Sequence, residues 1–370
     1  MKLTIKRSSF QKLVESVYEG IPQQTSDPCF KNFLLTVTEE GIELIGSDGT
    51  LTIKGILNNS DDDNAIINSN PGAVQVPAKY LLDIVRKLES SIVTVELIDE
   101  AILYISDEVA HFNLNINRAE DYPNIDLDSS GKEEVTLKAK DFERLYSATS
   151  FAVATKGPKE LFCGINITAK DNKLIFIATD SYRLARKYIN IDGDHLISIT
   201  VPSKTLAIVS HFGNYENITI KVDSSKALFI IGNYVISSKL YNGEFPNVDR
   251  IIPVATSYLL NVNSHEFINS IERITIVGNT KILVNASNDE IEISSKDIAV
   301  GSSKEILKDA KFDGERFSII FNASYVTDAI KALNTERVTL AFAAENRAFL
   351  VKSDDESITQ VITPIRSLDN

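Results

Sequence analysis

The sequence predicts an α+β protein made of three similar domains, each with two helices packed on antiparallel sheets. Three observations predict this fold class. A strand-then-helix pattern recurs six times, stretches of period-two alternation separate the helices, and a proline follows every second helix at a similar distance. Recurrence on this scale is typical of a fold assembled from repeated units.

The recurring pattern is an apolar residue, any residue, a second apolar residue and, five positions later, an apolar residue that opens helical periodicity. Successive copies begin 71, 61, 64, 61 and 59 residues apart. The copies are Leu3/Ile5/Phe10, Val74/Val76/Leu81, Val135/Leu137/Phe142, Ile199/Val201/Leu206, Leu260/Val262/Phe267 and Ile319/Phe321/Val326. Each copy predicts a strand that leads directly into a helix.

We therefore expect helices at residues 6–20, 76–90, 138–156, 201–213, 263–281 and 321–334. Pro77 and Pro202 fit the first turn of a helix, where the missing N–H costs no hydrogen bond, while Ser264 and Asn322 are expected to cap. The second helix is amphipathic. Its apolar face holds Leu81, Leu82, Val85 and Leu88, and its polar face holds Lys79, Asp83, Arg86 and Lys87.

Between the helices, apolar and polar residues alternate, as in Ile42-Glu43-Leu44 and Ile291-Glu292-Ile293. Such alternation between turn-forming residues predicts antiparallel strands with one buried face. The prolines at 123, 246 and 364 lie 47, 45 and 43 residues after Val76, Val201 and Phe321. This spacing predicts three equivalent domains, which we place at residues 1–128, 129–250 and 251–370.

The composition is that of an ordinary globular protein, with 43% hydrophobic residues in 370. No apolar stretch approaches the ~18 residues that span a bilayer, and the amino terminus does not resemble a signal peptide. A cytoplasmic location is expected. Cys29 and Cys163 are isolated in the sequence, so we expect buried, reduced thiols.

The net charge of −13 by itself argues against binding to nucleic acid. The distribution of charge argues the other way, because the six expected helices hold 14 basic and 9 acidic residues while the remainder holds 24 basic and 42 acidic. Glutamate favours helices as much as lysine does, so helix propensity explains this segregation poorly. A basic helical surface is expected instead.

The sequence lacks the patterns of common catalytic and metal sites. The four histidines, His111, His195, His211 and His265, have no neighbouring ligand at metal spacing. Residues 46–49 are a turn-like Gly-Ser-Asp-Gly without the lysine of a phosphate loop. We therefore expect a protein that is not an enzyme and that uses no metal or cofactor.

Three motifs resemble the bacterial DNA polymerase sliding clamp, the β subunit of DNA polymerase III. Residues 178–185, Ala-Thr-Asp-Ser-Tyr-Arg-Leu-Ala, resemble the family's Ala-Thr-Asp-Gly-His-Arg-Leu-Ala segment. Residues 242–247, Asn-Gly-Glu-Phe-Pro-Asn, resemble its Gly-x-Phe-Pro-[Asp/Asn] turn, and residues 362–366, Ile-Thr-Pro-Ile-Arg, its carboxy-terminal x-Met-Pro-Met/Val-Arg. The resemblance covers essentially the whole chain.

The resemblance implies a ring of two subunits joined head to tail, in which twelve helices face duplex DNA without reading its sequence. Such a ring tethers the replicative polymerase and other factors for processive replication. The candidate DNA-binding residues are basic residues of the expected helices: Arg7, Lys12, Lys79, Arg86, Lys87, Lys140, Arg144, Lys156, Lys204, Arg273 and Lys331.

The resemblance also implies a groove between the second and third domains that takes the short peptide motifs of the polymerase, the clamp loader and repair factors. Carried over, it comprises Phe162, Thr179, Ser181, Tyr182, Arg183, Leu184, Pro246, Ile251, Val361, Thr363, Pro364, Ile365 and Arg366. Thr363 and Ile365 stand where methionine is frequent. Stiff β-branched side chains predict a narrower or shifted motif preference.

The dimer interface implied by the resemblance involves Phe112 and Leu114 on one side and Ile274 and Ile276 on the other. A place in the internal core is an equally good interpretation of these apolar residues.

An alternative function also stays open, namely a repeat-built scaffold or an enzyme that kept the fold without encircling DNA. The low positive charge of the fifth and sixth helices favours this alternative, and the carboxy-terminal motif favours the clamp.

Overall fold

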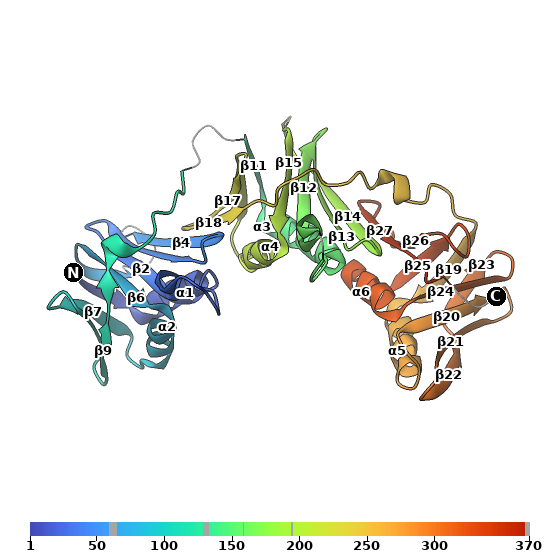
Figure 1. The fold of residues 1–370 in the computed structure, drawn as a ribbon, viewed down its shortest axis with the longest axis horizontal. Helices are drawn as coiled ribbons and strands as arrows, with labels where there is room; N and C mark the ends of the chain where they lie inside the picture. The colour runs from blue at the N-terminus through green and yellow to red at the C-terminus, as the bar shows by residue number, and fades with distance from the viewer. Residues whose placement is uncertain (59–64, 129–132, 158, 194, 367–370) are drawn as a thin grey trace. The chain divides into compact units, whose positions relative to one another are not determined.

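The computed structural model describes residues 1–58, 65–128, 133–157, 159–193 and 195–366 (Figure 1). The chain forms two compact units, one of Met1–Ala139 with Ile208–Leu240 and one of Lys140–Ala207 with Tyr241–Asn370. The middle third of the sequence is therefore divided between the units. The expected division into three domains stays a prediction.

Each of the six expected helices is present in the described residues, and each is shorter than expected. They are α1 (Arg7–Tyr18), α2 (Ala78–Lys87), α3 (Ala139–Thr149), α4 (Ser203–Ser210), α5 (Ser264–Thr275) and α6 (Ala323–Leu333). α2 ends where Leu88 turns to extended backbone, and α6 where Asn334 is left-handed, with φ of 50°. Lys156 consequently lies in a loop beyond α3.

The helix caps agree with one expectation and correct another. The side chain of Asn322 accepts a hydrogen bond from the backbone N–H of Ser324, as expected of a cap. At α5 the cap is Asn263, whose side chain accepts from Glu266, and Ser264 is the buried first residue of the helix. The expectation for Ser264 was wrong because α5 begins at Ser264 itself, directly after Asn263, the last residue of β19 (Tyr258–Asn263).

The first unit contains two sheets. The five-stranded sheet has the order β5-β1-β7-β8-β9 and the nine-stranded sheet the order β10-β6-β2-β3-β4-β18-β17-β16-β11. The strands of the smaller sheet are β1 (Lys2–Lys6), β5 (Ile66–Asn70), β7 (Ile92–Ile98), β8 (Ile102–Ser106) and β9 (His111–Asn115). Those of the larger are β2 (Asn32–Val37), β3 (Gly41–Ser47), β4 (Leu51–Asn58), β6 (Gly72–Pro77), β10 (Asn117–Arg118), β11 (Glu133–Lys138), β16 (Asn217–Val222), β17 (Lys226–Ile231) and β18 (Tyr234–Lys239).

The second unit also contains two sheets, with the orders β15-β12-β13-β14-β27-β26-β25-β19-β23 and β22-β21-β20-β24. The strands of the larger sheet are β12 (Gly164–Lys170), β13 (Lys173–Thr179), β14 (Arg183–Asn190), β15 (Ile197–Pro202), β19 (Tyr258–Asn263), β23 (Ala310–Asp313), β25 (Arg337–Phe342), β26 (Phe349–Lys352) and β27 (Ile358–Ile362). Those of the smaller are β20 (Lys281–Ala286), β21 (Ile291–Asp297), β22 (Gly301–Ile306) and β24 (Phe317–Asn322).

All the described strand pairs are antiparallel, which confirms the prediction from alternation. Eighteen of the described strands form six ladders of three consecutive strands, namely β2–β4, β7–β9, β12–β14, β16–β18, β20–β22 and β25–β27. In two places the third strand of one ladder pairs with the third strand of another. These places are β4 with β18 and β14 with β27. The third strands β9 and β22 each have one neighbour, β8 and β21, and so lie at sheet edges of the described chain.

The cores lie between the helices and the sheets. On α2 the predicted apolar face is buried and the predicted polar face exposed. Phe10, Phe142 and Phe267, which open the odd-numbered helices of the sequence pattern, are all fully buried.

The cysteines differ from the expectation of buried thiols, since Cys29 and Cys163 are free but only half-buried. No helix of the described residues is long and apolar enough to cross a membrane.

An aspartate organises the turn between β8 and β9. The carboxylate of Asp107 accepts backbone hydrogen bonds from Val109 and Ala110 within the turn and from Glu89 and Ser90 after α2. These four N–H donors stabilise the charged form and hold the pKa of Asp107 well below its usual range. The side chain thus ties the end of α2 to the strand pair that ends in β9.

We expect Asp107→Asn to lower the melting temperature at pH 7, because the amide replaces an acceptor oxygen with a donor. A depressed folded-state pKa contributes stability that is present above the ordinary aspartate value of 3.8 and lost as the pH falls toward the folded-state pKa. Thermal unfolding at pH 7 and at pH 3 should therefore show a smaller gap between the variant and the parent at pH 3. Glu108→Gln at the exposed neighbouring position is the control, and an equal gap at both pH values would contradict the assignment.

Candidate functional sites

The edge strand β9 carries two of the apolar residues expected at a subunit interface. Phe112 and Leu114 are half-buried and alternate with exposed His111, Asn113 and Asn115. An edge strand presents unpaired N–H and C=O groups along its free side. The strand is therefore able to add a further strand from another chain.

The other two expected interface residues separate in the structure. Ile274 is 2% exposed and belongs to the core of the second unit, whereas Ile276 caps the end of α5 and is 79% exposed. For Ile274 the interpretation as internal core is confirmed, because the inward face of α5 continues to that residue.

Ile298 and Val300, in the turn that leads into β22, are also highly exposed, at 100% and 69%. The sequence pattern missed these two residues, since exposure in a turn leaves no periodic signal.

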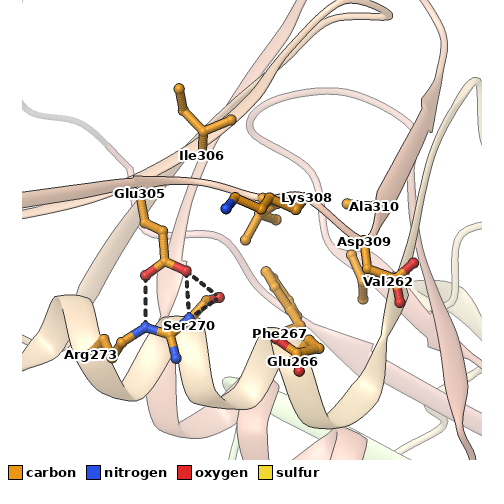
Figure 2. A pocket seen from close by; sticks show the side chains of 11 residues that line it. Val262, Glu266, Phe267, Ser270, Arg273, Glu305, Ile306, Lys308, Asp309 and Ala310 are labelled. Atoms are coloured by element: carbon orange, nitrogen blue, oxygen red, sulfur yellow. Dashed lines mark hydrogen bonds and ion pairs between the residues drawn. The ribbon is translucent and has the colours of Figure 1, made fainter.

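A pocket of about 430 Å³ lies between α5 and the end of β22 (Figure 2). Arg273 on α5 contacts Glu305 on β22 through two hydrogen bonds, from Nε at 3.0 Å and from Nη2 at 2.6 Å. Ser270 Oγ donates to the same carboxylate at 2.7 Å. The Arg273 guanidinium therefore lowers the pKa of Glu305, and Glu305 raises that of Arg273.

A small apolar cluster lies beside β14 and β27, where the partner groove was expected. Leu184, Val248 and Val361 are buried in it, and partly buried side chains pack around them: Ile177, Phe245, Ile252, Ala348 and Leu350. Phe162 contacts Phe245 edge to face, with ring centroids 6.1 Å apart. Ile251, half exposed, and the exposed Pro246 lie in the segment that carries Phe245 and Val248. The structure thus brings the three predicted segments together.

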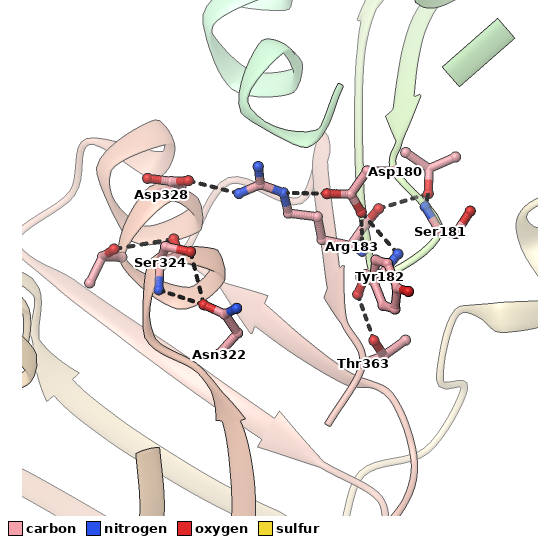
Figure 3. Close-up of polar contacts among 10 residues, drawn as sticks. Asp180, Ser181, Tyr182, Arg183, Asn322, Ser324, Asp328 and Thr363 are labelled. Carbon is pink, nitrogen blue, oxygen red and sulfur yellow. Dashed lines mark hydrogen bonds and ion pairs between the residues drawn. The ribbon is translucent and has the colours of Figure 1, made fainter. Parts of the chain in front are cut away.

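Arg183 connects this cluster to α6 (Figure 3). Its guanidinium donates to Asp180 at 3.0 Å and to Asp328 at 2.7 Å, and it lies over the rings of Phe151 and Tyr325. Tyr182, 61% exposed, stacks on Tyr325 with ring centroids 6.3 Å apart. Sequence reasoning missed Tyr325, although an aromatic residue in the first turn of α6 was a visible signal.

The carboxy-terminal segment is fastened at two points. The backbone N–H and the hydroxyl of Thr363 both donate to the carbonyl of Tyr182 at 2.8 Å, and the N–H of Ile365 donates to the carbonyl of Ile320 at 2.7 Å. Pro364 and Ile365 are half-buried and Arg366 is exposed. Thr179 is buried and its hydroxyl donates to the carbonyl of Arg183, which fixes the turn that presents Tyr182.

Ser181 holds a backbone conformation that favours glycine, with φ of 79°. This is the position at which the resembling segment carries glycine. The N–H of Ser181 donates to Thr179 Oγ1, and the N–H groups of Tyr182 and Arg183 donate to the carboxylate of Asp180. These bonds keep the turn in its conformation despite the side chain at Ser181.

The candidate DNA-binding residues lie mainly on exposed helix faces, but several have partners within the chain. Arg86 pairs with Glu15, Arg144 with Asp141, Lys331 with Glu272 and Arg273 with Glu305. Lys12 lies over the ring of Tyr215, and Arg7 donates to Gln11. Lys79, Lys87, Lys140, Lys156 and Lys204 are exposed. Basic residues outnumber acidic ones on α1, α2 and α4, whereas α5 is net acidic.

Among the described residues there is no group of three or more His, Cys, Asp or Glu side chains that could hold a metal ion.

Comparison with known proteins covers the whole chain. The sequence matches the N-terminal, central and C-terminal domains of the DNA polymerase III beta subunit over residues 1–126, 136–247 and 249–366. It is 29% identical to the beta sliding clamp of Staphylococcus aureus strain Mu50 and 27% identical to that of Bacillus subtilis, over 99% of this chain and 100% of each relative. The crystal structure of the Bacillus subtilis DNA polymerase sliding clamp matches with a TM-score of 0.93 at 27% identity, over 99% of both chains.

Proposed function

The chain belongs to the DNA polymerase III beta subunit family, and from this premise we propose that two copies close head to tail into a ring around duplex DNA. Its function is that of a DNA sliding clamp in replication, which tethers a polymerase and does not itself catalyse a reaction. The observation that carries the proposal is that three consecutive domains of this family account for the chain. We expect it to act in the cytoplasm, with domain boundaries near residues 128 and 250.

Ring closure is supported by the two edge strands. β9 belongs to the first compact unit and β22 to the second, and each lacks a second neighbour within the described residues. A contact between two different surfaces repeated around an axis closes into a ring when the rotation per copy divides a full turn. Two copies, each offering one β9 and one β22, supply two such contacts.

The test of encirclement is retention on DNA of different topology. A closed ring should stay on nicked circular DNA after loading and should slide off when the circle is cut to a linear molecule. Binding that does not depend on topology would favour a scaffold that kept the fold without encircling DNA. The net acidic character of α5 is the observation that favours this second function.

DNA contact in the proposed ring is distributed over the exposed basic residues of α1 to α4. Such contacts to phosphates are electrostatic and independent of sequence. Two of these cations, Arg86 and Arg144, already pair with acidic residues, but exposed pairs of this kind contribute only about 0–1 kcal/mol. They can therefore exchange a carboxylate for a phosphate at little cost.

We expect charge reversal of Arg86, Lys87 and Arg144 together to weaken retention on circular DNA and to flatten its salt dependence, equally for all DNA sequences. Each single reversal should have a small effect. The control reverses Lys170 and Lys173, the last residue of β12 and the first residue of β13, which belong to no helix. Unchanged retention of the triple variant would contradict the placement of DNA on the helix faces.

The apolar cluster beside β14 and β27 is proposed as the site for peptide segments of the polymerase, the clamp loader and repair factors. The buried side chains of Leu184, Val248 and Val361 form the apolar floor of this site. The side chains of Tyr182 and Ile251 are exposed to solvent. A few apolar anchors beside polar groups suit a short peptide. The ion pairs of Arg183 hold the turn of Tyr182 against α6.

A further inference from the structure

The segment that follows β18 in the sequence holds an asparagine directly before a glycine, Asn242-Gly243. It is the only Asn-Gly pair in the sequence. We propose that Asn242 converts without an enzyme to aspartate and isoaspartate, and that the isoaspartate form binds partner peptides more weakly at the apolar cluster beside β14 and β27. The conversion stands by itself, whereas its effect on peptides rests on the proposed function.

The conversion needs only the two adjoining residues and water. The backbone nitrogen of Gly243 loses its proton and bonds to Cγ of Asn242, which closes a succinimide ring. The side-chain nitrogen leaves as ammonia and carries that proton away. Water then opens the ring by breaking one of the two bonds to the ring nitrogen. Breaking the bond to Cγ gives aspartate, and breaking the bond to the backbone carbonyl carbon gives isoaspartate. No electrons are transferred.

Ring closure needs an unhindered backbone nitrogen on the residue after the asparagine, and Gly243 provides it. Its φ of 111° is a conformation that glycine adopts readily and other residues rarely adopt. A Cβ built on Gly243 would have only Leu161 Cδ1 nearby, at 3.3 Å, among the described atoms outside the adjoining residues. Little therefore obstructs the approach of the two reacting atoms.

The two reacting groups are also exposed. Asn242 and Gly243 lie on the surface, outside the helices and strands. No hydrogen bond within the described part of the chain involves the side-chain amide of Asn242 or the N–H of Gly243. The amide can therefore rotate toward the backbone, and the N–H can lose its proton to water, without first breaking a bond inside the protein.

A second asparagine in the same exposed segment, Asn247, lacks these features. Its Oδ1 accepts a hydrogen bond from the N–H of Asp249 at 2.9 Å, which holds the side chain in place. The residue after it is the buried Val248, whose branched Cβ hinders the backbone nitrogen. The two asparagines should therefore differ strongly in their rates of conversion.

The chain is fixed on both sides of Asn242. The N–H of Tyr241 donates to the carbonyl of Thr200 at 2.9 Å, and the ring of Phe245 contacts that of Phe162 edge to face. Isoaspartate lengthens the backbone by one atom between these two points, because the chain then runs through Cβ and Cγ. Since Phe245 packs against the apolar cluster beside β14 and β27, its displacement should distort the peptide site.

Peptide mapping tests the conversion. Trypsin cuts after Lys239 and Arg250, so one fragment, residues 240–250, holds both asparagines. The full chain is incubated warm at mildly alkaline pH and analysed by tandem mass spectrometry beside a sample from time zero. We expect Asn242 to gain about one dalton about tenfold faster than Asn247 or more, and more slowly at mildly acidic pH. A gain that is equal at the two asparagines, or absent from Asn242, would overturn the inference.

Asn242→Gln is the matched control for the conversion. Glutamine keeps the neutral amide on a side chain that is one methylene longer, and this amide closes its ring far more slowly. The fragment of this variant should keep its mass during the incubation. An equally fast gain at residue 242 in both proteins would show that a succinimide at Asn242 is not the route, contrary to the inference.

Isothermal titration with a polymerase-derived peptide tests the effect on binding. Ion exchange separates the converted chains, which carry one additional negative charge, and they should bind the peptide about tenfold more weakly than fresh protein. Asn242→Asp adds the same charge without lengthening the backbone and should bind as the fresh parent does. If this variant binds as weakly as the converted chains, isoaspartate is not the cause and that part of the inference fails.

The fresh parent separates this inference from the proposed function. If fresh protein does not bind the peptide, the proposed peptide site is wrong and the effect on peptides with it, while the mass gain still decides the conversion. If fresh and converted protein bind equally well, the effect on peptides is overturned and the proposed function stands.

Discussion

A chain that ends at Thr363 is expected to lose binding of partner peptides while it still forms the ring. The deletion removes Pro364, Ile365 and Arg366, including the hydrogen bond between Ile365 and Ile320, but leaves both bonds of Thr363 to Tyr182 in place. Interface energy is concentrated in a few anchored side chains, so the loss should be on the order of 2 kcal/mol or more, which is about thirtyfold in affinity. Isothermal titration with a peptide from the clamp-binding segment of the replicative polymerase measures it.

The matched control for this deletion removes only residues 367–370, which lie outside the described part of the chain, and should bind the peptide as the parent does. Light scattering on both truncated chains checks that each is still a dimer. Equal peptide affinity of all three proteins would place the peptide site elsewhere. A chain ending at Thr363 that is no longer a dimer would show that the tail supports the fold instead.

The second large effect is expected at β9. Phe112→Asp should convert the dimer into a folded monomer, because the substitution places a charge on the half-buried face of the strand that the second copy would cover. Ile274, named by the sequence as an interface residue, is unsuitable for this test, since a charge in the core of the second unit would unfold it. Sedimentation gives the molar mass, and circular dichroism shows whether the fold persists.

Asn113→Asp is the matched control for Phe112→Asp, because it adds the same charge one residue along on the exposed face of the same strand. The control should remain a dimer. If the Phe112→Asp protein also sediments as a dimer, the second copy does not cover β9, and the subunit interface must lie on another surface.

The elements of the fold were largely predictable from the sequence. Period-two alternation and the recurring strand-then-helix pattern located the helices and the antiparallel strands, because each signal depends on which residues face the core. The ends of the helices were not predictable to the same accuracy. Apolar residues of the following loop or strand continue the helical pattern, as happened after Thr149, where the expected helix extended to Lys156.

The candidate sites were predictable in parts that depend on local chemistry. The motif around Arg183 and the carboxy-terminal motif do lie together, on neighbouring strands β14 and β27. The alternation of apolar and polar residues could not reveal which charged residues distant in sequence pair with one another. In the sequence, Lys331 and Arg273 look like equivalent free cations on two helices. In the structure, Lys331 has a single exposed ion pair, whereas Arg273 makes three hydrogen bonds to Glu305 and Ser270. Such partners depend on which strand lies beside the helix.

The division of the middle third between two compact units also governs the order in which the chain can fold. β4 ends at residue 58, but its partner strand β18 begins only at residue 234. In the same way, β14 can pair with β27 only after the chain has been synthesised to residue 362. Contacts so distant in sequence carry a large loop-closure entropy and form slowly. During synthesis at about 5–20 residues per second, the β4 edge therefore stays without its neighbour for roughly ten seconds or more. The nascent chain thus exposes strand edges that the finished protein covers, and a shielding chaperone should raise its folding yield.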